Sequence, residues 1–330
     1  MEDHPLADAA PALSILLLPV FNGAAFLQEQ ITSIVEQTFR NFELLIYDDA
    51  SSDSSPGLLR TLAAGDARIR LFGSSTNLGQ KSALRYLLAK AGGRHLMFSD
   101  QDDIWHPGKI EALRASIGEA SLSYGISELI DQDGNSLGKS LFDFVGPPFT
   151  GVDRIDFLLK NTASGHAMMV RREVVDPGIF LFDADYDWLI AVIATFSAGV
   201  VYAPEAITYH RQHANNQVNK LGAVPKRKES SLAKRRHWIM RVHDILLVAR
   251  GATTIPEQKR VVFNQLYQAL RSDILLSLPA TIYHRRFELV FTQMLDNLRI
   301  PAADRQRLHK PIMKICRGPL HPKTIRDALF

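Results

Sequence analysis

Three aspartates within four residues are the most informative group of side chains in this chain. Asp100, Asp102 and Asp103 stand in the segment SDQDDIW at 99–105, directly after a short apolar run. Asp100 and Asp102 can both reach one divalent ion, and carboxylate oxygens are ligands that suit Mg²⁺ or Mn²⁺. An acidic cap on the helix after Pro107 is the simpler explanation, but a cap needs one carboxylate, and three repel one another unless a cation is bound. We therefore expect a metal site that a nucleotide diphosphate completes.

A second acidic group consists of Asp48, Asp49 and Asp53, which follow the apolar run at 42–47. A carboxylate in this place can accept a hydrogen bond from a pyrimidine N–H, while a neighbouring group holds ribose hydroxyls. An ordinary turn of Asp and Ser explains the same residues equally well. Taken alone, the motif leaves both interpretations open.

A third candidate is Asp187, which opens the apolar stretch at 188–191. An ionised carboxylate within hydrogen-bond reach of a hydroxyl can act as its general base. Asp183 and Asp185 are alternatives for this role. The simpler explanation is that Asp187 caps the start of a helix.

A regular succession of strands and helices has to position these side chains. Apolar runs predict strands at 13–19, 42–47, 68–72 and 94–98, and amphipathic stretches predict helices at 26–37, 56–64 and 81–90. This alternation predicts an α/β fold with a parallel, doubly wound sheet, in which ligands bind beyond the carboxyl ends of the strands. The polar residues that follow these strands, and therefore gather at one edge, are Asn22, Asp48, Asp49, Asn77 and the three aspartates of 99–105.

The pattern changes beyond residue 120. A hairpin is predicted within 120–137, with its turn at Asp133-Gly134, and strands are predicted at 166–171 and 200–202 around a helix at 188–197. After residue 219 the strand signals end, and amphipathic helices are expected at 231–252, 257–278 and 284–298. We therefore predict a catalytic region at 1–219 and a helical region at 220–330.

The net charge of +3 conceals two regions of opposite charge. Residues 1–219 hold 16 Lys and Arg against 27 Asp and Glu, and residues 220–330 hold the remaining 22 and 8. The basic helices either pack on the first region through Ile245, Leu246, Phe263 and Leu266 or meet an anionic partner, such as membrane headgroups or a diphosphate-bearing lipid; both can hold. No nucleic-acid-binding module accompanies the charge, so nucleic acid is not an expected partner.

Composition points to a soluble globular protein, with 46% hydrophobic and 22% charged residues. Cys316 is the single cysteine and excludes an intramolecular disulfide. The acidic first twelve residues do not resemble a signal peptide, and no apolar run approaches the ~20 residues that span a bilayer. We expect a cytoplasmic protein, with peripheral attachment to the inner face of the cell membrane as an option.

Several segments in order resemble the family-2 glycosyltransferases with the GT-A fold, and most closely their bacterial rhamnosyltransferase-like branch. The segments are LPVFNG (18–23), QT (37–38), FELLIYDDASSD (42–53), NLG (77–79) and SDQDDIWHPGK (99–109). TASGHAMM (162–169), DWLIA (187–191) and HRQHANN (210–216) fit the same branch, so the resemblance covers roughly residues 13–219.

The resemblance implies a role for individual residues. Donor and nucleotide binding would fall to Pro19, Phe21, Asn22, Asp49, Asn77 and Asp100, with Asp49 facing the base and Asp100 near the ribose. Asp102 and His213 would hold Mg²⁺ or Mn²⁺, with His210 as the competitor of His213, and Asp187 would be the general base. Trp105, Ser164, Gly165 and Trp188 would shape the acceptor or donor-sugar pocket, although a tight turn before a strand explains Ser164 and Gly165 equally well.

This sequence departs from the family pattern at three places. Val20-Phe21 stands where Thr-Tyr is common, Tyr186 where His often precedes the catalytic Asp-Trp pair, and His210 where Tyr usually precedes Arg-Gln-His. The first two leave the identity of the donor open. None of the three removes a carboxylate from the expected chemistry.

The function that the resemblance implies is inverting transfer of a sugar from a nucleotide-sugar donor to a saccharide hydroxyl. dTDP-rhamnose is the first expectation for the donor, with UDP-hexoses behind it, and a lipid-linked precursor of a bacterial surface polysaccharide is the expected acceptor. Two alternatives are a noncatalytic sugar-nucleotide-binding or scaffold subunit, and a nucleotidyltransferase on a similar sheet. The latter needs a basic phosphate loop after the first strand, yet VFNGAA (20–25) has no Lys or Arg.

Overall fold

The computed structural model describes residues 13–17, 19–213 and 231–269, together with the single residues 292, 296 and 305. Its first half alternates strands and helices as predicted, within a few residues at each end. The elements are β1 (Leu13–Leu17), α1 (Ala24–Val35), β2 (Phe42–Asp49), α2 (Ser55–Gly65), β3 (Ile69–Ser74), α3 (Gln80–Lys90) and β4 (His95–Ser99). The four strands pair in parallel, because a helix between each strand and the next returns the chain to the same edge.

The second half adds antiparallel pairs to this sheet. Its strands are β5 (Ile104–Trp105), β6 (Leu122–Ile130), β7 (Ser136–Ser140), β8 (Met168–Arg171) and β9 (Val200–Arg211), and its longer helices are α4 (Lys109–Ile117) and α7 (Tyr186–Phe196). Short helices lie between them: α5 (Phe142–Val145), α6 (Asp156–Leu159), η1 (Gly165–Ala167), η2 (Arg172–Val174) and η3 (Pro177–Leu181). The predicted β6–β7 hairpin is present, and Gly134 in its turn has a φ of 87°.

One prediction in this half is wrong in extent. The strand expected at 200–202 continues to Arg211 and pairs in parallel with β6 along most of its length. His210 and Arg211 therefore belong to a strand rather than to a loop.

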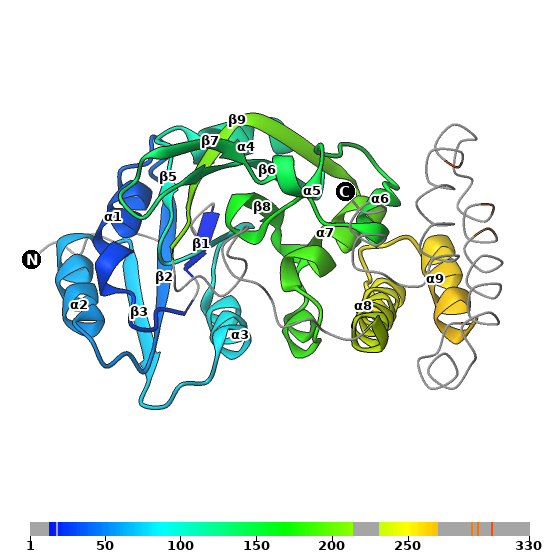
Figure 1. Ribbon diagram of the computed structural model, residues 1–330, viewed down its shortest axis with the longest axis horizontal. Coiled ribbons are helices and arrows are strands. Elements are labelled where there is room, and N and C mark those ends of the chain that lie inside the picture. Colours follow the sequence, from blue (N-terminus) through cyan, green and yellow to red (C-terminus); the bar gives the residue numbers. More distant parts are fainter. Residues whose placement is uncertain are drawn as a thin grey trace, which may run out of the picture.

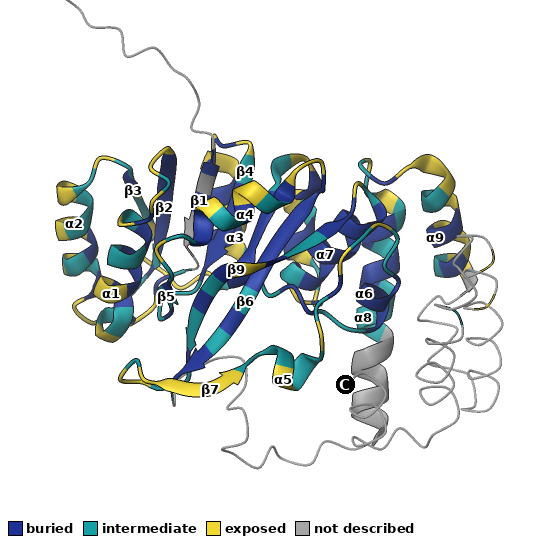
Figure 2. Ribbon diagram, turned by 90° about the horizontal axis from the view of Figure 1, so that it is seen from above, coloured by how far each residue is buried: buried dark blue, intermediate teal, exposed yellow. Residues whose placement is uncertain are grey.

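The nine strands of the described residues form one mixed sheet, drawn in Figure 1, with the order β3-β2-β1-β4-β8-β6-β9-β5 and with β7 beside β6. Both faces of its centre are covered. Within β2, Leu44 and Ile46 belong to a core with α1, α2 and α4, while Leu45 and Tyr47 belong to a core with α3 and α7. The alternation explains why this strand is apolar at every position from 44 to 47. Figure 2 shows the central strands buried and β7 exposed at the rim.

Two further helices, α8 (Ser231–Gly251) and α9 (Glu257–Ala269), lie beyond α7 (Figure 1). Ile245, Leu246, Phe263 and Leu266 are buried in the same core as α7, which confirms the predicted packing. The boundary near residue 220, the basic run 226–228 and the helix expected at 284–298 lie outside the described residues, so the division at 219 stays a prediction. Within the described part of the chain, no helix has both the length and the apolar character that crossing a bilayer requires.

Candidate functional site

The loop from Asp100 to Asp103 joins β4 to β5 at the edge where the parallel strands end. Gln30 Nε2 donates to Ser99 Oγ at 2.6 Å, and Gln101 Oε1 accepts from the backbone N–H of Phe21 at 3.1 Å. From the other side, Arg211 Nε donates to the carbonyl of Asp102 at 2.9 Å. The loop is therefore fixed by the chain that follows β1, by α1 and by the end of β9.

Asp102 and His213, the two predicted metal ligands, are neighbours in the structure. Asp102 Oδ2 and His213 Nε2 are 2.7 Å apart, although 111 positions separate the residues in the chain. Burial, and then the charges of Asp103 and Asp100, raise the pKa of Asp102 to about 6 against the opposing effect of His213. A carboxylate in such surroundings is stabilised by a cation. The geometry fits the predicted pair, and metal binding itself stays a prediction.

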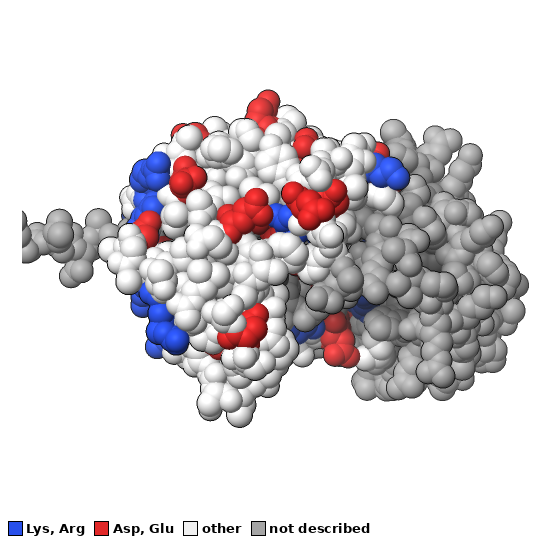
Figure 3. Space-filling model, turned by 60° about the vertical axis from the view of Figure 1, so that its left-hand side comes forward, with Lys and Arg blue, Asp and Glu red and all other residues white. Residues whose placement is uncertain are grey.

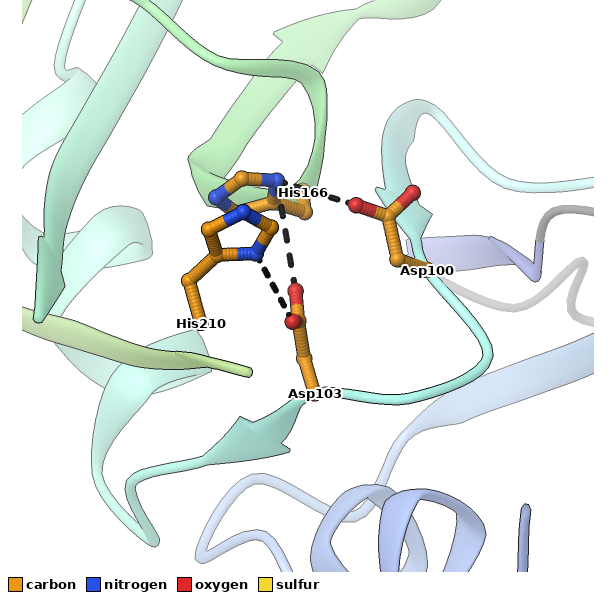
Figure 4. A group of neighbouring side chains, drawn as sticks. All are labelled: Asp100, Asp103, His166 and His210. Carbon is orange, nitrogen blue, oxygen red and sulfur yellow. Dashed lines mark hydrogen bonds and ion pairs between the residues drawn. The ribbon is translucent and has the colours of Figure 1, made fainter. Parts of the chain in front are cut away.

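A second group of four side chains, drawn in Figure 4, includes Asp103, the residue after Asp102 in the chain. Asp100, Asp103, His166 and His210 each offer one ligand atom, and these atoms lie within 4.8 Å of one another. The rings of His166 and His210 stack with centroids 4.5 Å apart. His166 Nδ1 is 3.1 Å from Asp100 Oδ2, and its Nε2 is 2.8 Å from Ser127 Oγ. We call these four residues the Asp-His cluster.

The centre of the Asp-His cluster is an ion pair between Asp103 and His210. Their Oδ1 and Nδ1 atoms are 2.9 Å apart, and the N–H of Arg211 also donates to Oδ1 at 3.1 Å. Burial alone would raise the pKa of Asp103, but the charges of His210 and His166 lower it to about 2. Burial also opposes the charge on His210, yet Asp103 raises its pKa to about 9. Asp103 Oδ2 is buried, accepts no hydrogen bond from the described residues and lies 3.9 Å from His166 Nδ1.

Sequence patterns did not assign two members of this cluster. Asp103 is the last acid of SDQDD, and His166 stands in TASGHAMM, so both occur in segments that carry the family resemblance. Lys109 was also missed. It is fully buried, donates to the carbonyl of His166 at 2.6 Å and has its pKa lowered well below the usual value by burial.

Asp187 lies in the first turn of α7, one residue inside the helix. Asp185 occupies the N-cap position, so the capping explanation for Asp187 is wrong. Asp187 Oδ2 accepts from the N–H of Gly165 at 3.1 Å, and Oδ1 accepts from the N–H of Trp188 at 2.7 Å. Burial, and then the charge of Asp185, raise the pKa of Asp187 to about 6. The side chain is thus held in one orientation and titrates near neutrality, as a general base requires.

Gly165 is required where the chain passes the start of α7. A Cβ atom at this position would lie 2.3 Å from the hydroxyl oxygen of Tyr186. Ser164, the neighbouring predicted pocket residue, is half-buried. The turn in η1 therefore brings Gly165 beside Asp187. The contact of Ser164 and Gly165 with a sugar stays a prediction.

The segment after β1 carries the predicted nucleoside pocket. Phe21 is 45% exposed and Pro19 is half-buried. Asn22 has a φ of 51°, and its Oδ1 accepts from the N–H of Ser52 at 2.8 Å and of Asp53 at 3.3 Å. Asn22 therefore joins the ends of β1 and β2 while Phe21 stays open.

Asp49 and Asn77 meet in the loop that precedes α3. Asp49 is buried, and its two oxygens accept from the N–H of Leu78 at 2.7 Å and of Gly79 at 2.9 Å. Asn77 Oδ1 also accepts from Gly79, at 3.2 Å. Asp49, which is expected to face the nucleotide base, thus already accepts hydrogen bonds from this loop. A bound nucleotide would have to share the carboxylate oxygens of Asp49 with these backbone N–H groups.

The two tryptophans predicted to line a pocket are buried. Trp105 is 1% exposed, and Lys109 Nζ lies 3.5 Å from its ring centroid. This prediction is corrected, because Trp105 is a core residue beneath the acidic loop. Trp188 is 8% exposed, its indole N–H donates to the carbonyl of Phe157, and only its rim is left to meet a ligand.

Comparison with known sequences identifies relatives along the first half of the chain. The family model "Glycosyl transferase family 2" matches residues 15–178. An uncharacterized glycosyltransferase of Rickettsia felis is 36% identical over 140 residues, which are 41% of this chain and 23% of that protein. The match thus spans less than a quarter of this protein and of its counterparts in Rickettsia conorii and Rickettsia bellii. The Escherichia coli UDP-Glc:alpha-D-GlcNAc-diphosphoundecaprenol beta-1,3-glucosyltransferase WfgD is 31% identical over 178 residues, 53% of this chain and 66% of that protein.

Comparison with solved structures extends the likeness to almost the whole chain. S. aureus TarS 1-349, in complex with UDP-GlcNAc, superposes with a TM-score of 0.56 at 14% identity, covering 96% of this chain and 90% of that one. At this identity the likeness concerns the fold alone, and it confirms the predicted GT-A architecture.

Proposed function

The chain belongs to glycosyl transferase family 2, and on this premise we propose that it transfers a sugar from a nucleoside diphosphate donor to a hydroxyl of a saccharide acceptor. The observation that carries the proposal is the contact of Asp102 with His213, together with Asp187 bonded to Gly165, the residue before His166, which itself contacts Asp100 of the acidic loop. The first two supply a cation site, and the third supplies a base of suitable pKa.

We assign a Mg²⁺ or Mn²⁺ ion to Asp102 and His213. A carboxylate whose pKa is raised by burial and by two neighbouring acids fits a hard divalent cation. When bound, the ion supplies Lewis-acid stabilisation of the charge that grows on the departing diphosphate. The Asp-His cluster is the alternative site. Asp103 is completely buried, whereas the side chains of Asp102 and His213 keep 15% and 11% exposure toward a nucleotide.

Asp187 acts as general base in an in-line displacement that inverts the anomeric carbon. It takes the proton of the acceptor hydroxyl as the acceptor oxygen bonds to the anomeric carbon and the bond to the diphosphate oxygen breaks. The N–H of Gly165 and of Trp188 orient its oxygens for this step. Asp100, held by His166, is assigned to the ribose side of the same edge.

The proposed donor is a pyrimidine nucleotide sugar. WfgD is named for a UDP-glucose donor, and the TarS structure contains UDP-GlcNAc, which favours UDP. dTDP-rhamnose, expected from the resemblance to the rhamnosyl branch, is the second candidate. The acceptor named for WfgD is a diphosphoundecaprenol-linked GlcNAc, and we propose a lipid-linked saccharide of this class, met at the cytoplasmic face of the membrane during polysaccharide synthesis.

The basic residues at 220–239 are proposed to serve this lipid-linked acceptor or the membrane around it. Their side chains lie outside the described residues. On the described part of the face in Figure 3, acidic side chains occupy the middle and basic ones mainly the left edge, without a continuous basic patch.

Thermal unfolding against a nucleotide panel tests the proposal directly. UDP, dTDP and GDP, each with Mn²⁺, with Mg²⁺ or without metal, are added to the full chain and to Asp102→Ala. A ligand that binds only the folded protein raises the Tm. We expect one pyrimidine diphosphate to raise it in a metal-dependent manner, and only in the wild type.

Product analysis then separates transfer from binding alone. The matching UDP- or dTDP-sugar is incubated with a synthetic GlcNAc-diphospholipid, and sugar transfer is followed by mass spectrometry. Nucleotide binding without product would favour a noncatalytic subunit. Formation of a sugar nucleotide from a nucleoside triphosphate would favour a nucleotidyltransferase.

A further inference from the structure

The segment 182–185, which leads directly into the helix of Asp187, is held from two opposite elements. Lys81, in the first turn of α3, donates from Nζ to the carbonyls of Phe182, Asp183 and Ala184, the last two at 3.2 and 3.3 Å. From α8, Asp244 Oδ2 accepts from the N–H of Ala184 at 3.1 Å. One residue is thus held at both its N–H and its carbonyl.

The contact from α3 uses all three N–H donors of the Lys81 ammonium group. An ammonium group has three donors, and Lys81 has three carbonyl acceptors. Hydrogen bonds that a charged group donates are stronger than those between neutral groups. Because the acceptors are backbone atoms of consecutive residues, this contact fixes the path of the chain rather than a side chain.

The contact from α8 is buried. Asp244 and Ala184 are both in the protein interior, and the neighbouring residues Ile245, Leu246 and Val248 pack in the core with α7. A second contact lies nearer the surface, where Arg241 and Asp185 form an ion pair of 3.3 Å. The described part of α8 therefore supports the start of α7 directly.

Lys81 also connects this segment to the predicted nucleotide pocket. Asp49, at the end of β2, holds the N–H of Leu78 and of Gly79, and α3 begins at the next residue. A continuous path of bonded groups therefore runs from Asp49 through Lys81 to the residues before Asp187.

We propose that Lys81 and Asp244 are positioning residues that set the place of the Asp187 carboxylate relative to the donor site. The proposal rests on the proposed function for its kinetic consequence, since it takes Asp187 as the base. It also gives α8 a part in catalysis that is separate from any membrane contact. A misplacement of about 1 Å in a reacting group can cost on the order of 100-fold in rate.

Matched variants test the two contacts in the full chain. Lys81→Met removes the three bonds and keeps the aliphatic stem, and Lys90→Met at the exposed end of the same helix is its control. Asp244→Leu removes the acceptor of the Ala184 N–H, whereas Asp244→Asn keeps an oxygen for it. We expect kcat with the GlcNAc-diphospholipid probe to fall about 10- to 100-fold in Lys81→Met and Asp244→Leu. We expect it to stay within about threefold of wild type in the other two, with the Kd for UDP–Mn²⁺ nearly unchanged in all four.

Amide hydrogen exchange of Gly165 gives a readout that needs no activity. Its N–H donates to Asp187, so a displaced carboxylate should speed its exchange at least about tenfold in Lys81→Met and Asp244→Leu only. Normal kcat and normal exchange in these two variants, or equal losses in Asp244→Asn and Asp244→Leu, would overturn the proposal. An inactive wild type with the expected exchange pattern would refute the proposed function and leave the positioning role standing.

Discussion

The backbone N–H of Gly165 donates a hydrogen bond of 3.1 Å to the carboxylate of Asp187, although 22 positions separate the two residues in the chain. The bond ties the start of α7 to the turn before β8. It stabilises the ionised form of Asp187, whereas burial and Asp185 favour the protonated form and prevail, so that the pKa is about 6. The chemistry and the stability of the protein therefore both depend on pH through this group.

The rate of transfer should rise with pH through the titration of Asp187. A base has to be ionised, so kcat/KM, whose pH dependence reports the groups of the free enzyme, should be low near pH 5, half-maximal near pH 6 and level above pH 7. Asp187→Asn should lose about 10²- to 10⁴-fold in kcat and retain nucleotide binding. Steady-state kinetics from pH 5 to 8 measure both, and Asp183→Asn is the control. Nearly normal turnover of Asp187→Asn would contradict the assignment of Asp187 as the general base.

The same substitution should stabilise the metal-free protein at neutral pH. Because the folded pKa of Asp187 is raised from 3.8 to about 6, the unfolded chain releases its proton first, and stability falls as pH rises from about 4 to about 6. Above that window the ionised carboxylate of Asp187 lowers the free energy of unfolding by about 3 kcal/mol. The substitution to Asn removes this penalty but weakens the hydrogen bonds of the side chain by about 1 kcal/mol. Urea denaturation should therefore show Asp187→Asn about 2 kcal/mol more stable than wild type at pH 8. The gain should vanish near pH 4.

Metal binding should depend on Asp102 rather than on the Asp-His cluster. Asp102→Ala should abolish the Mn²⁺-dependent rise in Tm with nucleotide, because the remaining His213 offers only one ligand. His210→Asn should keep the rise, measured from its own lower starting Tm. The reverse pattern would place the ion among Asp100, Asp103, His166 and His210.

The ion pair of Asp103 and His210 should give the protein a stability optimum on the acid side of neutrality. The lowered pKa of Asp103 gives a contribution present above about pH 4 that is lost toward pH 2. The raised pKa of His210 gives one present below about pH 6.5 that is lost as pH rises through 9. Asp103→Asn leaves a buried imidazole without its partner and should destabilise by about 3–5 kcal/mol at pH 6. Urea titrations at pH 6 and 9.5 should find the smaller loss at pH 9.5.

The parallel half of the fold was predictable because its signals are local. The runs LSILL and FELLIY are apolar except at Ser14 and Glu43, since both faces of the sheet are covered, and amphipathic stretches mark the helices between them. The carboxyl ends of these strands then fix where the acids gather. For this reason Asp102 could be singled out from the sequence, whereas Asp187 was singled out by the resemblance of its Asp-Trp pair to the family pattern.

The extent of β9 was not predictable in the same way. Its residues 203–211 include Pro204 and Glu205, which are exposed and rarely occur inside strands. The strand persists because β6 supplies a partner, with a shift in register between Tyr124 and Ile126 that accommodates the irregularity. His210 of the Asp-His cluster lies on this strand, so the sequence did not indicate which residues form the cluster.

The contacts of Lys81 and Asp244 could not be predicted from the sequence for another reason. Each links residues 60 to 103 positions apart through backbone atoms of the segment 182–184. Backbone acceptors carry no sequence signal, so neither periodicity nor a motif indicates them. Only the three-dimensional arrangement of α3, α7 and α8 brings them together.

The order of the strands requires the short acidic loop at 100–103 to connect two strands that are not neighbours in the sheet. β4 and β5 are separated in the sheet by β8, β6 and β9, so four strand spacings of about 4.8 Å, or about 19 Å, would divide them in a flat sheet. The five residue steps from Ser99 to Ile104 span at most about 17–18 Å when fully extended. The sheet must therefore curl until the end of β9 approaches β4, and this curl carries His210 and His213 to the aspartates. Deleting one residue between Asp100 and Asp103 would tighten the curl or detach β5, so the loop's length matters as much as its charges.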